Sequence, residues 1–126
     1  MSTKEFITKI RNLILDETSF TTVFSPELPP TGTNICAVSI LAGLTENSLV
    51  EYEYSTVTFR VLIRGNENDL DTRELCDEVF KALHLLQNIS LDNGKIINII
   101  GSTPIFVRKD ENKNCIYNIT FESNIQ

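Results

Sequence analysis

The clearest pattern in the sequence is a strict alternation of side chains over residues 57–64. The apolar set consists of Val57, Phe59, Val61 and Ile63, and the set between them consists of Thr58, Arg60, Leu62 and Arg64. Successive side chains of a β-strand point to opposite faces of the sheet. The alternation therefore predicts a strand that turns one face to the core and a more polar face outward.

Two other segments carry apolar residues at the three- and four-residue spacing of an amphipathic helix. We expect the first helix to run from Ser2 to about Asp16 and the second from Asp71 to about Asn88. Each opens with an oxygen-bearing side chain three residues before a glutamate, which is the spacing of a capping box. The helices and the alternating strand are expected to share one core, formed by Phe6, Ile10, Phe59, Val61, Ile63, Val79, Phe80 and Leu83.

Further apolar runs of strand length occur at residues 21–25, 34–41, 95–102, 105–109 and 115–122. Three prolines within residues 25–32 predict a stiff loop after the first of these runs, because proline has no amide donor. We therefore expect a single domain over residues 1–126 with an α+β fold. Its sheet should be mostly antiparallel with about five to six strands, and its two helices should pack on one face.

The composition is that of an ordinary globular protein, with 41% hydrophobic and 22% charged residues among 126. No apolar run approaches the ~20 residues that would span a bilayer, so we expect no membrane partner. The first residues show no signal-peptide pattern, which favours the cytoplasm of the cell that makes the protein. The net charge is −6, from 11 basic and 17 acidic side chains, and such a surface disfavours general binding to nucleic acid.

Residues suited to catalysis or metal binding are few. The three cysteines include no Cys-x-x-Cys pair, and the single histidine, His84, has no nucleophile at a familiar spacing. The acidic residues 67–71 invite a calcium interpretation, but Leu70 falls on a ligand position and the central glycine is missing. Helix capping explains the same residues, and a divalent ion there stays open as the alternative. We predict no catalytic residues, no metal site and no cofactor.

Positive charge is concentrated on the outward face of the alternating strand and at residues 108–109. Arg60 and Arg64 flank Leu62 on that face. We hypothesise that these three lie in an interface between subunits, where the acidic excess of a second copy supplies partners. The alternative is that they are solvated strand residues. The four isoleucines within residues 96–100 cannot all face one side of a strand, so a second subunit or covering loops must shield some of them.

Five segments of the chain follow one another in a recognisable order. They are the helix at residues 6–15, the stretch Phe-Ser-Pro-Glu-Leu-Pro-Pro at 24–30, and residues 36–43, 57–65 and 73–86. In this order of elements, over most of its length, the chain resembles the tail terminators of long-tailed bacteriophages, also known as tail-completion or minor capsid proteins. The similarity lies in the pattern of elements and not in a signature motif. Residues 45–54, which suit either a protruding hairpin arm or a long loop, have no counterpart in it.

The resemblance implies a hexameric ring that binds the last ring of the tail-tube protein, ends tube growth and presents a surface to a head–tail connector protein. It implies that DNA passes through the ring without sequence-specific binding, which suits the acidic charge. The protein would then sit at the head-proximal end of the tail in the virion, after synthesis in the host cytoplasm. Within residues 45–54, Glu46, Glu51, Tyr52 and Glu53 would face the tube or the neck.

Two other classes of protein remain open. The same order of elements suits a small dimeric α+β regulatory or ligand-binding module, in which two sheets pair face to face. An enzyme is the third class, and it is the least favoured because the sequence offers no set of catalytic residues. The molar mass in solution separates the first two classes, since a hexameric ring and a dimer differ threefold in mass.

Overall fold

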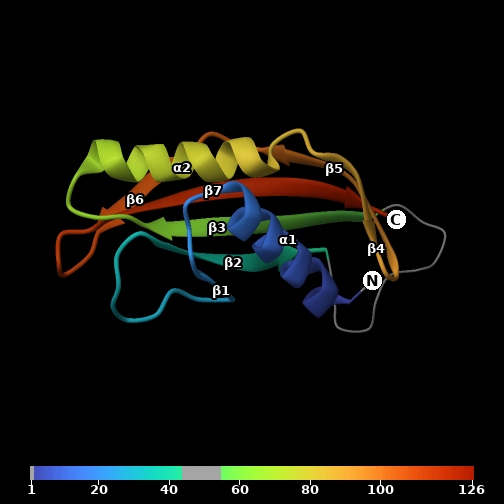
Figure 1. Cartoon of the computed structure of the whole chain (residues 1–126), viewed down its shortest axis with the longest axis horizontal. Coiled ribbons are helices and arrows are strands. Elements are labelled where there is room, and N and C mark those ends of the chain that lie inside the picture. The colour runs from blue at the N-terminus through green and yellow to red at the C-terminus, as the bar shows by residue number, and fades with distance from the viewer. Residues whose placement is uncertain (1, 44–54) are drawn as a thin grey trace.

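The computed structural model describes residues 2–43 and 55–126 of the chain. Its helices are α1 (Thr3–Glu17) and α2 (Asp69–Leu83). Its strands are β1 (Val23–Phe24), β2 (Ile35–Ala42), β3 (Ser55–Arg64), β4 (Gln87–Leu91), β5 (Gly94–Gly101), β6 (Ile105–Lys109) and β7 (Cys115–Ile125). Figure 1 shows both helices on the same face of one sheet, with α1 crossing the strands obliquely and α2 running along them. The expected α+β fold with two helices on one face is confirmed.

The strands follow the order β1-β2-β3-β7-β5-β4, and β6 pairs with β7 beside β5. β1 runs parallel to β2, whereas the other pairs are antiparallel. The expectation of a mostly antiparallel sheet with fewer strands is therefore corrected to a mixed sheet, with seven strands in the described residues. The parallel pair arises because the proline-containing loop carries the chain back to the start of β2, whereas a tight hairpin would reverse it.

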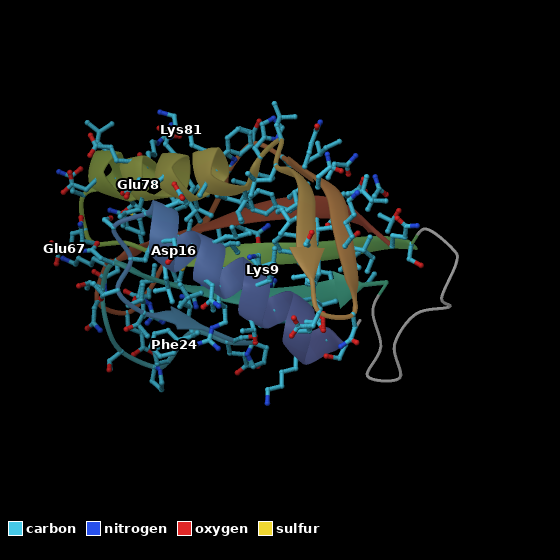
Figure 2. The ribbon with its side chains drawn as sticks, turned by 45° about the vertical axis from the view of Figure 1, so that its right-hand side comes forward. Lys9, Asp16, Phe24, Glu67, Glu78 and Lys81 are labelled. Atoms are coloured by element: carbon cyan, nitrogen blue, oxygen red, sulfur yellow. The ribbon has the colours of Figure 1, made fainter. Side chains whose placement is uncertain are left out.

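The second helix ends at Leu83, well before the expected stop at Asn88. Backbone pairing with β5 replaces helical hydrogen bonds there: the Leu85 N–H donates to Ile99 O at 2.8 Å, and the Ile99 N–H donates to Leu86 O at 3.0 Å. The chain then forms β4, a strand that the sequence did not predict because its side chains are mostly polar and exposed. Figure 2 shows the β4–β5 hairpin curling from the sheet toward α1.

The start of α1 is as expected, and it also holds the curled hairpin. Ser2 is the N-cap, and its Oγ accepts a hydrogen bond from the Glu5 N–H at 3.1 Å. The Glu5 carboxylate bonds to Asn93 and not to the N-cap residue: it accepts hydrogen bonds from the backbone N–H and the side-chain amide of Asn93, at 3.0 and 3.1 Å. These bonds tie the β4–β5 turn to the first turn of α1.

The start of α2 differs from the expected one. The helix begins at Asp69, and its N-cap is Asn68 instead of Asp71. The Asn68 Oδ1 accepts hydrogen bonds from the N–H groups of Leu70 at 2.9 Å and Asp71 at 3.2 Å. Asparagine and aspartate cap helices equally well, so the sequence alone offers two starts. The earlier start makes Thr72 the fourth residue of the helix, and its side chain is fully buried.

One hydrophobic cluster fills the space between the helices and the sheet. At its centre the Phe59 ring lies between Phe6, edge-on with centroids 5.5 Å apart, and Phe121, stacked at 5.2 Å. The residues expected in the core are all buried except Phe80, which is half-buried and packs against the cluster. Gly101 of β5 is part of the same packing, because a Cβ there would lie 2.7 Å from the Phe121 ring. The predicted core is confirmed.

Replacing Phe59 with Ala should lower the free energy of unfolding by about 3–5 kcal/mol, through lost transfer energy and the cavity left between two aromatic rings. Urea unfolding followed by circular dichroism measures the change. Leu41→Ala is the matched control, since that side chain is 50% exposed, and it should cost less than about 1 kcal/mol. A comparably small loss for Phe59→Ala would show that β3 turns its other face to the core.

Candidate functional site

The three residues that the sequence assigns to a subunit contact alternate along β3 with its core residues, so they lie on the face of the sheet turned away from the helices. In the register of the sheet, Arg60 of β3 lies between Ser39 of β2 and Thr120 of β7. The β3 residues that alternate with Arg60, Leu62 and Arg64 are fully buried in the core. The alternation predicted from the sequence is thus confirmed, and it directs these three side chains to the outer face.

A groove of ≈ 490 Å³ runs along this outer face, between β3, β6, β7 and the proline-containing loop. Its apolar lining comes from Leu62, Ile105, Val107 and Ile116, and its charged lining from Arg60, Arg64, Arg108 and Glu27. The groove therefore gathers the predicted contact residues with residues of β6 and the loop that the sequence did not connect to them. An apolar strip edged by arginines is the composition of many protein–protein contacts.

Arg64 is the residue whose surroundings differ most from expectation, because it is only 7% exposed and has partners within its own subunit. Its Nη1 donates hydrogen bonds to Pro29 O at 2.9 Å and Gly32 O at 3.5 Å. Its Nε lies 3.1 Å from Oδ2 of Asp110. Arg64 therefore joins the end of β3 to the proline-containing loop and to the β6–β7 turn. The sequence gives no sign of this, since all three partners lie far from Arg64 in the chain.

Asp110 is held by the turn that it begins. Its Oδ1 accepts hydrogen bonds from the backbone N–H groups of Asn112 and Asn114, both at 2.9 Å. Burial opposes ionisation of Asp110. The hydrogen bonds from Asn114 and Asn112 and the charge of Arg64 outweigh burial and hold the pKa of this carboxyl below its usual range. The ion pair therefore forms a rigid corner at one end of the groove.

The other two arginines of the groove have no such partners. The Arg60 Nε donates a hydrogen bond to Ser39 Oγ at 3.2 Å. Neither Arg60 nor Arg108 forms an ion pair with an acidic residue of the ranges 2–43 and 55–126. Arg60 is half-buried and Arg108 is exposed. Both positive charges are therefore available to a partner that enters the groove.

β6 supplies most of the exposed apolar surface of this region. In the described part of the chain it pairs with β7 alone, so its other edge is unpaired. Ile105 is 62% exposed and Val107 48% exposed, and both line the groove. Phe106 points to the helix side, where its ring lies edge-on to Tyr117 at 5.5 Å. An exposed edge strand with consecutive apolar side chains is a candidate site for contact with another protein.

His84 is not the exposed residue of a polar helix face that the sequence indicated. It is the C-cap of α2 and is half-buried, with its ring stacked on Phe80 at 4.4 Å between centroids. Its Nδ1 accepts a hydrogen bond from the Gly101 N–H at 2.9 Å. The histidine therefore joins α2 to β5, and its role is structural.

The acidic loop and the cysteines likewise have partners or surroundings that explain them. The Asp69 carboxylate accepts a hydrogen bond from the Tyr117 hydroxyl at 2.5 Å and pairs with Arg73 at 2.8 Å. The Tyr117 bond, followed by Arg73, holds the pKa of Asp69 below its usual range. Within the described ranges no group of three or more His, Cys, Asp or Glu is arranged to hold a metal ion. All three cysteines are free and buried: Cys36, Cys76 and Cys115.

Burial raises the pKa of the Cys36 and Cys76 thiols to about 12, so these side chains remain protonated and poorly nucleophilic. The expected tube- or neck-facing residues Glu46, Glu51, Tyr52 and Glu53 lie outside the described residues. None of the helices in those ranges combines the length and the apolar character needed to cross a membrane.

The fold and the outer face together define a small α+β structural domain with an open contact surface. A family model for the bacteriophage tail terminator protein matches residues 13–126. The chain therefore belongs to the bacteriophage tail terminator family. No curated protein sequence matches the chain.

Two solved structures share the fold at low sequence identity. A chain in the virion of a native gene transfer agent particle superposes with a TM-score of 0.59 and 8% identity, over 94% of this chain and 90% of that chain. A second solved chain superposes with a TM-score of 0.54 and 9% identity, over 98% of this chain and 92% of that chain. At such low identity these likenesses establish a common fold and no further property.

The ionised Asp110, held by hydrogen bonds from Asn114 and Asn112 and by the charge of Arg64, should make stability depend on acid. Because the pKa of Asp110 is lower in the folded chain than in the unfolded one, its ionised form stabilises the fold above about pH 4. That contribution is lost as the pH falls through the folded-state pKa. Asp110→Asn should therefore be less stable than the wild type at neutral pH, and the difference should shrink in acid. Urea unfolding at about pH 7 and pH 3 measures this, with the exposed Asp92→Asn as control. An unchanged difference between the two pH values would contradict the assignment.

Proposed function

We propose that this protein assembles into a hexameric ring that caps the tail tube, ends its growth and provides the surface to which the head is joined. The observation that carries the proposal is the match of residues 13–126 to the tail terminator family. An outer sheet face that both helices leave uncovered supports it as well (Figure 1), because exposed apolar strands need a protein partner.

The mechanism is capping by complementary surfaces, in which no covalent bond is made or broken. A ring of identical subunits uses head-to-tail contacts, so that one patch of each copy meets a different patch of the next copy. In this proposal Arg60, Leu62 and Arg64 lie at one of the two patches. Arg60 and Leu62 contact the neighbouring copy, while Arg64 keeps the wall of the groove in place.

The partners of the ring are the tail-tube protein on one side and the head–tail connector protein on the other. DNA passes through the ring without sequence-specific binding, and the net charge of −6 supports this because an acidic surface does not hold the phosphate backbone. The ring works at the head-proximal end of the tail, after synthesis in the host cytoplasm. Glu46, Glu51, Tyr52 and Glu53 face the tube or the neck in this proposal.

A dimer whose sheets pair face to face is the second candidate, since it would also cover the apolar groove. Contact about a two-fold axis brings the same patch of both copies together. Arg60 and Arg108 of one copy would then approach the same arginines of the other copy without acidic partners in the groove beyond Glu27. This repulsion favours the head-to-tail ring over the dimer.

Size-exclusion chromatography with light scattering tests the proposal, with the protein alone and after mixing with tail-tube protein. We expect a hexameric mass, and electron micrographs should show tubes that stop growing and carry a ring at one end. A dimeric mass in both samples, together with tubes of uncontrolled length, would rule the proposal out.

Arg60→Glu should lower the association of subunits at least about tenfold and abolish capping, because it places a carboxylate where the neighbouring copy presents one. The fold should persist by circular dichroism, since Arg60 lies on the outer face. Lys4→Glu makes the same charge change at an exposed site on α1 and should assemble normally. Arg64 is left unchanged because its reversal would break bonds within the subunit. If Arg60→Glu assembles like the wild type across a salt titration, Arg60 lies outside the subunit contact.

A further inference from the structure

The first turn of α2 presents an apolar side chain within a field of carboxylates. Leu70 is 71% exposed there. Four exposed acidic residues lie on the preceding loop and along the helix: Glu67, Asp71, Glu74 and Asp77. Helical spacing places Glu74 and Asp77 on the same side of α2 as Leu70, one and two turns further on. We refer to Leu70 and these four carboxylates as the acidic knob.

None of the four carboxylates of the acidic knob forms an ion pair within residues 2–43 and 55–126. The basic side chain nearest to it in the helix, Arg73, is paired with Asp69 at 2.8 Å. Carboxylates in a first turn stabilise a helix N-terminus, but the backbone donors there are already capped by Asn68. Stabilisation of the helix N-terminus therefore explains one or two of the carboxylates. It does not explain why Leu70 is exposed.

The groove on the outer sheet face has the opposite composition. Its apolar lining, which includes Leu62 and Ile105, is accompanied by the positive charges of Arg60 and Arg108. Those two arginines form no ion pair with the acidic residues that the structure describes. An apolar side chain surrounded by carboxylates thus matches, in both polarity and charge, an apolar groove accompanied by arginines.

The two surfaces are placed so that they can meet only between copies. Figure 1 shows α2 on one side of the sheet, and the groove lies on the face turned away from the helices. Both surfaces are at the same end of the strands, where α2 begins, β3 ends and β6 lies. A contact that joins two different patches is head-to-tail, which is the kind of contact that builds a ring.

We infer that the acidic knob of one copy docks into the groove of the next copy, with Leu70 against the apolar lining and the carboxylates beside Arg60 and Arg108. This inference rests on the proposed ring and adds the second of its two contact patches. The contact is electrostatic at its edges, so the association should weaken as the salt concentration rises.

Two variants with opposite charges test the contact. The groove variant Arg60→Glu/Arg108→Glu makes both patches of a copy acidic, and the knob variant Glu67→Lys/Glu74→Lys/Asp77→Lys makes both patches basic. Each variant alone should lose association at least about tenfold. An equimolar mixture should regain it, because every contact in a ring of alternating variants joins unlike charges. Lys4→Glu/Lys81→Glu makes the same change of charge as the groove variant at exposed sites of the two helices, so it is the control for that variant and should assemble like the wild type.

Light scattering on each variant and on the mixture, at low and high salt, gives the readout, and circular dichroism checks the fold. Recovery in the mixture confirms the inference, and it also shows that both variants fold. Unimpaired single variants, or a mixture that stays dissociated while the wild type forms rings, would overturn it and leave the ring itself standing. Variants that assemble normally but no longer bind tail-tube protein would assign the groove to that partner and overturn it too. A wild type that never forms a ring would instead refute the proposed function.

Discussion

The packing of the Phe59 ring between Phe6 and Phe121 is the contact on which the rest of the structure depends. It joins α1, β3 and β7 at the centre of the core. Successive side chains of a strand point to opposite faces of the sheet. Because Phe59 faces the helices, its two neighbours in β3 must face outward. Both helices cover the same face, so that neither helix covers the outer face (Figure 1). The open part of the outer face is therefore a direct consequence of how the core is packed.

Arg64 turns part of that outer face from a flexible surface into a rigid one. The buried guanidinium donates hydrogen bonds to two carbonyl groups of the proline-containing loop, and its Nε forms an ion pair with Asp110 without an aligned hydrogen bond. The two segments that wall the groove are thereby held to the end of β3. A surface that is already ordered loses less conformational entropy when a partner binds, which favours tight association. The same arginine is thus unsuited to contact a partner through its charge, although it lies among residues that are suited to it.

The parts of the fold that follow from local patterns could be predicted from the sequence, and the parts that depend on distant partners could not. The alternation in β3 and the apolar stripes of both helices gave the core correctly because burial imposes those periods. β4 was missed because a short polar strand has no periodic signal, and its pairing with β5 decides its conformation. The start of α2 was misplaced because Asn68 and Asp71 are equally good caps. The face that holds Arg60 was predictable, whereas the burial of Arg64 depends on carbonyl groups more than thirty residues away.

Charge decides how such subunits can associate. Each copy carries a net charge of −6, so copies repel one another at long range and random association is disfavoured. Attraction between copies must then come from a local patch of positive charge. In the described residues Arg60 and Arg108 form such a patch. The positive patch lies on one face of the sheet and the acidic surface of α2 lies on the other. A favourable contact between copies would therefore join unlike patches. In the proposed assembly, an open chain of subunits has one free patch of each kind, one at either end, until the chain closes on itself. Both the preference for unlike patches and the closing of the proposed ring therefore depend on this one asymmetry of charge.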